Sequence, residues 1–405
     1  MKIIKKIVVL QVLIAVQMCF FDRSHAQNTE NLRAKIIARD GRNLEFEFRS
    51  SRAQAYKSVV TERTSDLSMS WDAYTSTSLG SFGISRHVIE VPEDAPETFF
   101  KFKLNTHLLR TPESRFDEID GFDYVPKYAH IGEEGLRIAF IDEGEGIPII
   151  LLHGVDSWSY VWRNYIGPLT ESGLRVIAID MPGYGRSDKP ASLTSHTKES
   201  HHFWLNELLI KHLDIENAVV VASTIMTDTA ARLLVDSGER FIGFVALSPS
   251  FHDGSDEGLN SNFRQTFELV KSSIGLPIGD FVAFNSSREL TPEEHHAFSA
   301  PFNTTAHKEA SLSVSGSLEP TSEDHPSAEN QKMYWNSFKE SEIPILVLSS
   351  DHAVQSSWIE QYKNIPGASG QPHHHFPAET ANIEHDFQEE VLGKILEFMD
   401  QFRLE

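Results

Sequence analysis

Two patterns of hydrophobic and polar positions divide this chain. Between residues 28 and 108, short segments such as Leu44–Phe48 and Thr98–Leu104 alternate apolar and polar side chains. A period of two is that of a half-buried β-strand, and the Ser, Thr, Asp and Gly clusters between the segments are typical of turns. The pattern predicts a small, all-β, sandwich-like module over residues 28–108.

From Leu109 onward, strand-like segments alternate with helical ones. Continuous apolar runs are typical of strands that are covered on both faces. Helical periodicity appears between them at Phe203–His212 and Asp228–Asp236. This order predicts an α/β domain over residues 109–405 with a mainly parallel sheet. The predicted strands are Leu136–Ile141, Ile147–Leu152, Arg175–Ile179, Ala218–Val221, Phe244–Leu247 and Ile345–Leu348.

The first 26 residues have the form of a signal peptide. Lys2, Lys5 and Lys6 precede a largely apolar run over residues 7–21, and small residues stand at the positions that signal peptidase reads before a cut after Ala26. The alternative, an uncleaved anchor, is disfavoured because two glutamines interrupt a run shorter than the roughly 20 apolar residues that span a bilayer. We therefore expect an exported protein, periplasmic or extracellular, with no membrane span after cleavage.

Composition narrows the partners further. The 405 residues carry a formal net charge of -22. This charge disfavours binding to nucleic acid or to anionic membranes, because proteins that bind them need basic surfaces. The single cysteine, Cys19, lies in the predicted signal peptide, so the mature chain would hold no disulfide. In the β module, Trp71 and Tyr74 could stack on a sugar, although such aromatics are more often core. We expect this module to act as a spacer or to dock another protein or glycan.

Four ordered segments resemble haloalkane dehalogenases, and the resemblance covers Leu109–Gln401. It implies an α/β-hydrolase fold with a helical cap, here over about residues 252–335, and a capped pocket for a small apolar molecule or an ester. The segments that carry it are Arg110–Phe116, His153–Tyr160, Asp180–Pro190, and Leu290–Glu293 with Ala300–Phe302.

The nucleophile position departs from that family. Its members attack the halogen-bearing carbon with an aspartate on a sharp strand-to-helix turn, and the resulting ester is cleaved by water. Counting without gaps from either side places this position at Thr224, which cannot form such an ester. Ala222 and Met226 stand where the turn favours small residues, which predicts that the strained turn is lost. Asp228 is one helical turn away and is interpreted as a polar residue of the first turn.

The residues at the halide-binding positions also differ from those of the family. The family places a tryptophan directly after the nucleophile, where this chain has Ile225, and no tryptophan occurs between Trp204 and Trp335. Trp158 remains, either as an N–H donor or as packing. Without indole donors the leaving ion loses its stabilisation, so dehalogenation is the least favoured function.

The resemblance makes His385 the candidate base. Asp351 is the candidate acid, although only a two-residue deletion brings it to the position that gap-free alignment gives to Ala353. Asp253 is the alternative. Backbone N–H groups of Val155 and Ile225 would form the oxyanion hole, because such donors do not depend on the side chain.

Two classes of function stay open. A non-catalytic protein that binds through its pocket or surface leads, and an ester-type hydrolase is the alternative. In the hydrolase His385 would deprotonate Ser223, after a one-residue shift of the turn, or Thr224. The hydrolase needs one of these hydroxyls within reach of His385, whereas in a binding protein Ile225 and Met226 would fill that space.

No cofactor or metal is expected. Three consecutive histidines, His373, His374 and His375, lie between prolines. This arrangement predicts a solvated loop rather than a zinc site. The paired His295 and His296 of the predicted cap are interpreted in the same way.

Overall fold

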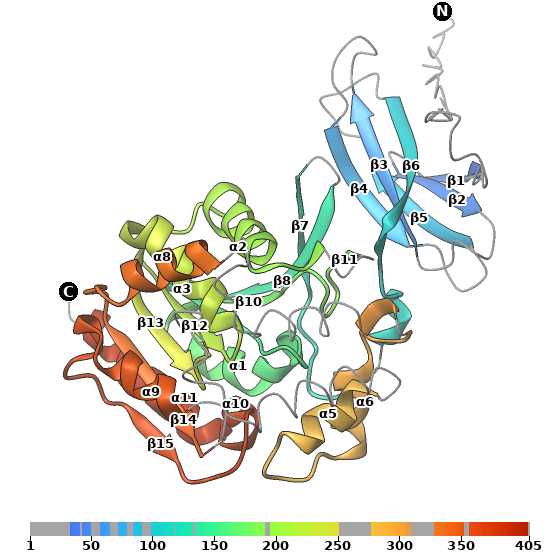
Figure 1. Cartoon of the computed structure of the whole chain (residues 1–405). Helices are drawn as coiled ribbons and strands as arrows, with labels where there is room; N and C mark the ends of the chain where they lie inside the picture. Colours follow the sequence, from blue (N-terminus) through green and yellow to red (C-terminus); the bar gives the residue numbers. More distant parts are fainter. Residues whose placement is uncertain are drawn as a thin grey trace, which may run out of the picture. The chain divides into compact units, whose positions relative to one another are not determined.

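The computed structural model describes strands between residues 33 and 90 and most of residues 99–403, without 118, 133–134, 191–194, 251–276, 305, 309–327 and 352–355. The predicted signal peptide, Asp253, Trp71 and much of the predicted cap lie outside the described residues. The chain forms two compact units, residues 1–112 with 132–136 and residues 113–131 with 137–405 (Figure 1).

The first unit is built from antiparallel strands. β2 pairs with β1 and β5, and β3 pairs with β4 and β6. The two strands predicted from alternation coincide with β2 and β6. The bounds are β1 (Arg33–Asp40), β2 (Asn43–Arg49), β3 (Lys57–Thr64), β4 (Asp72–Ser78), β5 (Ile84–Glu90) and β6 (Phe99–Leu109).

The second unit contains an eight-stranded sheet in the order β15-β14-β13-β12-β9-β10-β8-β7. Along this order, the neighbouring strands from β15 through β9 to β10 pair in parallel, and β8 runs antiparallel to β10. The six predicted strands are confirmed. The bounds are β7 (Lys127–Ile131), β8 (Leu136–Glu143), β9 (Ile147–Leu152), β10 (Leu174–Asp180), β12 (Ala218–Ser223), β13 (Phe241–Leu247), β14 (Ile345–Ser350) and β15 (His374–Phe376); the short β11 is Lys189–Pro190.

Two groups of helices accompany this sheet (Figure 1). α1 packs on α11, and α3 packs on both α2 and α8. The longer helices are α1 (Arg163–Glu171), α2 (Lys198–Asn206) continued by the π-helical η6 (Glu207–His212), α3 (Met226–Ser237), α6 (Pro292–Ser299), α8 (Ala328–Phe338), α9 (Ser356–Lys363) and α11 (Gln388–Met399). The shorter helices are α5 (Ile278–Phe284), α10 (Ile383–Asp386), η3 (Glu113–Arg115), η4 (Ser159–Trp162), η7 (Gly238–Arg240), η9 (Pro366–Ala368) and η10 (Asp400–Phe402).

The central strands form the core of the second unit. Every residue of β12 and β14 is buried, as the apolar runs predict for strands that helices cover on both faces. In such sheets ligands bind beyond the carboxyl ends of the parallel strands, and Ser223 is the last residue of β12. Among the described residues, none of the helices is both long and apolar enough to cross a membrane.

Candidate functional site

The turn between β12 and α3 keeps the geometry of a nucleophile elbow. β12 ends at Ser223 and α3 begins at Met226. Between them Thr224 has a φ of 48°, in the left-handed region. A β-branched residue there is strained by about 1–3 kcal/mol. The strained residue of the turn is therefore Thr224, which stands at the gap-free position, and the prediction that Met226 would abolish the turn is wrong.

Neighbouring groups hold Thr224 in this conformation. Its N–H donates to the Leu247 carbonyl at 2.8 Å, and its own carbonyl accepts from the N–H and the Oγ1 of Thr227 at 3.1 and 2.6 Å. Gly154 lies opposite, where an added Cβ would stand 3.1 Å from Thr224 Oγ1 and 3.5 Å from Ser223 Oγ. The glycine thus leaves the space that the two hydroxyl side chains use.

Ser223 is hydrogen-bonded to a carboxyl group that the sequence did not single out. Its Oγ donates to Glu384 Oε1 at 2.6 Å, and the two residues are 0% and 1% exposed. Burial raises the pKa of Glu384 to about 7, against the opposing effect of the Ser223 hydrogen bond, and Asp156 raises it further. Burial also raises the pKa of Asp156. Both side chains are therefore shifted toward the neutral form, which is a poor nucleophile.

His385 has a cation rather than a carboxylate at its Nδ1. Arg288 Nη2 lies 3.3 Å from that atom, and Nε2 has no hydrogen-bond partner among the described residues. Burial, and next the charge of Arg288, lower the pKa of His385 to about 4. Asp351 instead contacts His375, with 2.9 Å between Oδ1 and Nε2. The structure therefore lacks the predicted pairing of Asp351 with His385, and Asp253 stays a prediction.

Asp228 lies in the first turn of α3 and is buried in a charged network. Its carboxylate lies 2.5 Å from Arg232 Nε and 3.2 Å from Lys198 Nζ. Burial alone would raise the pKa of Asp228, but these two cations lower it to about 2. Gln331 also donates to this carboxylate, at 3.3 Å. With these partners the carboxylate is not available at the elbow.

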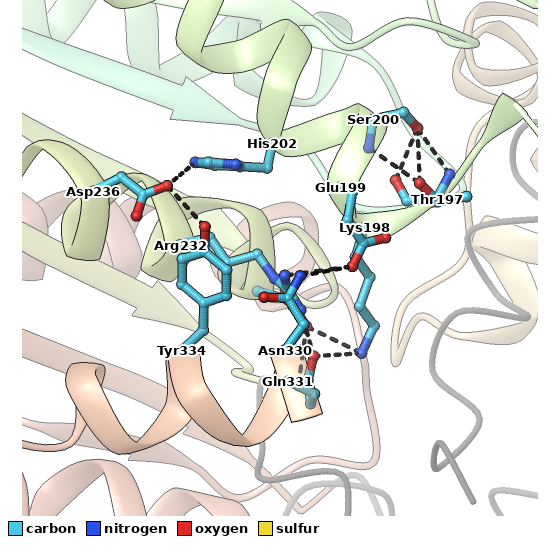
Figure 2. A network of polar contacts seen from close by, with 11 residues as sticks. Thr197, Lys198, Glu199, Ser200, His202, Arg232, Asp236, Asn330, Gln331 and Tyr334 are labelled. Atoms are coloured by element: carbon cyan, nitrogen blue, oxygen red, sulfur yellow. Dashed lines mark hydrogen bonds and ion pairs between the residues drawn. The ribbon is translucent and has the colours of Figure 1, made fainter. Parts of the chain in front are cut away.

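The same network joins three helices (Figure 2). Arg232 of α3 donates to the Gln331 side-chain oxygen of α8 at 2.5 Å, and Lys198 of α2 donates to that oxygen at 3.1 Å. The Arg232 guanidinium stacks 4.6 Å from the centre of the Tyr334 ring, and the Tyr334 hydroxyl donates to Asp236 at 2.8 Å. These contacts fix the helix that begins at the elbow.

The halide-binding side of the site is apolar or already occupied. Ile225 is buried directly after Thr224. The indole N–H of Trp158 donates to the Ala297 carbonyl at 2.9 Å, and its ring packs on Phe116 and Tyr160. Trp158 therefore has the packing role. Val155 follows Gly154 in the loop after β9. Its N–H stays a candidate for the oxyanion hole.

The histidines of the C-terminal segment do not converge on one point. His374–Phe376 forms the edge strand β15, so the predicted loop is wrong. His373 bridges the Val347 N–H and the Ala368 carbonyl, whereas His375 contacts Ser349 and Asp351. Within the described residues no group of three or more His, Cys, Asp or Glu side chains could hold a metal ion. His295 of α6 lies 3.6 Å from Asp280.

Comparisons with known proteins agree with this architecture. Residues 147–390 match a family model described as alpha/beta hydrolase fold. A haloalkane dehalogenase of Psychrobacter cryohalolentis is 31% identical over 302 residues, which are 73% of this chain and 97% of that protein. A haloalkane dehalogenase from Mycolicibacterium paratuberculosis is 29% identical over 297 residues, covering 72% of this chain and 97% of the relative.

Solved structures give the same result. The tetrameric haloalkane dehalogenase DpaA from Paraglaciecola agarilytica NO2 matches with a TM-score of 0.62 and 25% identity, over 71% of this chain and 97% of that one. An esterase from Exiguobacterium antarcticum shares the fold, with a TM-score of 0.55 and 16% identity over 68% of this chain and all of that chain. The chain belongs to the α/β-hydrolase fold family and, within it, is a haloalkane dehalogenase-like protein.

Proposed function

We propose that this protein is a non-catalytic, ligand-binding member of its family that has lost halide displacement. The observation that carries the proposal is the elbow itself, which keeps its left-handed φ of 48° while presenting a threonine. Displacement of halide by a carboxylate gives an ester that water can open at the carbonyl. Attack by the Thr224 hydroxyl would instead give an ether, which has no carbonyl, so the cycle could not be completed.

Neighbouring carboxyl groups do not replace the missing one. Asp228 is bound by Arg232 and Lys198. Glu384 accepts from Ser223 and has a pKa raised to about 7 by burial. A displaced halide would also find the indole N–H of Trp158 engaged with the Ala297 carbonyl. The retained fold without these groups supports binding rather than turnover.

One observation favours a second candidate, an ester hydrolase. Ser223 Oγ lies 2.6 Å from Glu384 Oε1, and a carboxylate with a pKa near 7 is suited to general-base catalysis at neutral pH. In that reaction Glu384 would take the Ser223 proton as the oxygen attacks an ester carbonyl. Against it, Ser223 precedes the turn residue and is fully buried. His385 donates to or accepts from neither hydroxyl among the contacts that the structure describes.

The setting of the protein is part of the proposal. The basic, apolar and small-residue order of residues 1–26 supports export to the periplasm or the exterior. In that setting the N-terminal strands would dock another protein or a glycan, and the second unit would bind a small apolar molecule or an ester.

A steady-state assay tests the proposal. The purified mature chain is offered short-chain 4-nitrophenyl esters and 1,2-dibromoethane, beside Ser223→Ala, Thr224→Ala, Glu384→Gln and His385→Ala. Ser172→Ala is the control, because its hydroxyl caps the end of α1. We expect equal background rates in all six proteins. Ester turnover lost in Ser223→Ala and Glu384→Gln would establish the hydrolase, and halide release by the wild type would refute the loss of displacement.

A further inference from the structure

We propose that Arg288 is a positioning residue that holds His385 as a neutral ring with its proton on Nε2. The ring would then offer the site a hydrogen-bond donor instead of a base. This goes beyond the threonine at the elbow, because it concerns His385, the candidate base. Its consequence for the ligand rests on the proposed binding function.

The chemistry of the pair fixes the position of the proton. A guanidinium has only donors, and a neutral imidazole has one donor nitrogen and one acceptor nitrogen. Because Arg288 Nη2 lies 3.3 Å from His385 Nδ1, Nδ1 is the acceptor and Nε2 carries the proton. A general base needs the opposite arrangement, with a carboxylate accepting from Nδ1–H and Nε2 free to take a proton.

Arg288 is itself held in place by several acceptors. Its two terminal nitrogens donate to Glu294 Oε1 and Oε2 at 2.7 and 2.9 Å. It also donates to the Glu289 carbonyl at 3.0 Å and to the His385 carbonyl at 3.4 Å. With Nδ1 of His385, these contacts match the five N–H groups of the guanidinium. The Arg288 head cannot turn away from the ring without losing charge-assisted bonds.

Glu294 ties this arrangement to the rest of the fold. Its Oε1 also accepts from Arg163 of α1 at 2.6 Å, and its Oε2 accepts from the Thr291 N–H at 3.0 Å. Glu294 and Thr291 form the capping box at the start of α6. The helix cap and the arginine pair thus hold the Glu294 carboxylate, and among the described residues Arg288 rather than an acid contacts His385 Nδ1.

Burial, and next the charge of Arg288, lower the pKa of His385 and favour the neutral ring. Arg288 and Arg163 disfavour the imidazolium, whereas Glu294 and Asp386 favour it. Glu294 is shared by both arginines, and Asp386 accepts from the Ser287 N–H and hydroxyl at 2.5 and 2.8 Å. The ring therefore stays neutral at neutral pH, with a single N–H.

That N–H indicates the class of ligand. His385 is 1% exposed, its Nε2 has no acceptor among the described residues, and the Phe298 ring lies 5.3 Å from its own ring. A buried donor without an acceptor is destabilising, and a ligand that supplies an acceptor removes that penalty. The donor fits an apolar molecule that presents an oxygen lone pair, such as a ketone, an ester carbonyl or an ether.

Nitrogen-15 NMR of the histidine rings in the mature chain tests the inference, with the His385 signals assigned from a His385→Gln spectrum. At pH 7 we expect a protonated Nε2 and an unprotonated Nδ1. Arg288→Leu should shift the ring toward the Nδ1–H form and raise its pKa by one unit or more. Arg288→Lys should retain the wild-type form, because lysine also only donates. A merely structural role of Arg288 would not move the proton between the two nitrogens.

A probe pair tests the donor role. Saturating cyclohexanone should shift the Nε2 signal, and methylenecyclohexane, which has the same shape but no lone pair, should not. An Nδ1–H ring in the wild type, an unchanged tautomer in Arg288→Leu, or no response to cyclohexanone would overturn the inference. Ester turnover by a chain with the Nε2–H ring would overturn only the proposed function.

Discussion

Replacement of the buried carboxyl at the elbow should change how stability depends on pH. Glu384 is fully buried, and burial raises its pKa from 4.5 to about 7. One pKa unit corresponds to about 1.4 kcal/mol, so ionisation of this group in the folded state costs about 3 kcal/mol more than in the unfolded chain. Glu384→Gln keeps an acceptor for Ser223 and cannot ionise, so it should remove that cost.

The direction follows from the proton balance. The folded pKa is the higher one, so the folded state binds more protons between pH 4.5 and about 7. The stabilisation is complete below pH 4.5 and is lost as the pH rises through about 7. Relative to Glu384→Gln, the wild type should therefore lose about 3 kcal/mol between pH 4.5 and pH 8.5.

Urea unfolding followed by tryptophan fluorescence measures this difference. Wild type, Glu384→Gln and the control Glu389→Gln, an exposed residue of α11, are unfolded at pH 4.5 and pH 8.5. We expect Glu384→Gln to gain stability over the wild type only at the higher pH, while the control follows the wild type at both. An equal effect of Glu384→Gln at the two pH values would refute the assignment of a neutral, buried carboxyl.

Three further perturbations test the elbow and its surroundings. Arg232→Met should destabilise the fold by about 3 kcal/mol. This is the lower end of the free-energy cost of breaking a buried ion pair, because Lys198 still contacts Asp228. Thermal unfolding of this variant and of the surface control Lys394→Met measures the loss, and equal midpoints in the two variants would contradict it. Thr224→Gly should stabilise by about 1 kcal/mol by relieving the left-handed threonine, whereas Thr229→Gly within α3 should destabilise; loss of stability in Thr224→Gly would show that the turn is unstrained. Burial lowers the pKa of His201 well below 6.5, so the wild type should lose stability as the pH falls through 6.5. In urea unfolding at several pH values, the free energy of unfolding of His201→Gln should fall less with decreasing pH than that of the wild type. An equal pH dependence of the two proteins would contradict this prediction.

The fold was accessible from the sequence because it depends on local patterns. Apolar runs such as Ile345–Leu348 located the strands to within a few residues, and the gap-free count reached Thr224, the left-handed residue of the turn after β12. The prediction about Met226 was wrong because the turn is held by distant groups, chiefly the Leu247 carbonyl and the space beside Gly154. Local side-chain size did not contain that information.

The rest of the site depends on contacts between residues far apart in the chain. Ser223 and Glu384 are 161 positions apart, and Arg288 and His385 are 97 apart. Glu384 directly precedes His385 in a recognisable segment, but no spacing rule pairs it with Ser223 or pairs Arg288 with His385. The His385 segment was recognisable, but its partner was predicted as an acid from resemblance, whereas the fold places a cation there.

The most direct test of the account is a search for a covalent intermediate. His385→Ala and the wild type are incubated separately with 1-bromohexane and with 4-nitrophenyl hexanoate, and intact-protein mass spectrometry with peptide mapping follows. Because removal of the base slows the breakdown of any ester intermediate, a working nucleophile would accumulate as an adduct in His385→Ala. We predict no hexyl or hexanoyl group on Ser223, Thr224, Asp228 or Glu384 in either protein. A stoichiometric adduct on one of these residues would contradict the loss of catalysis and identify the nucleophile.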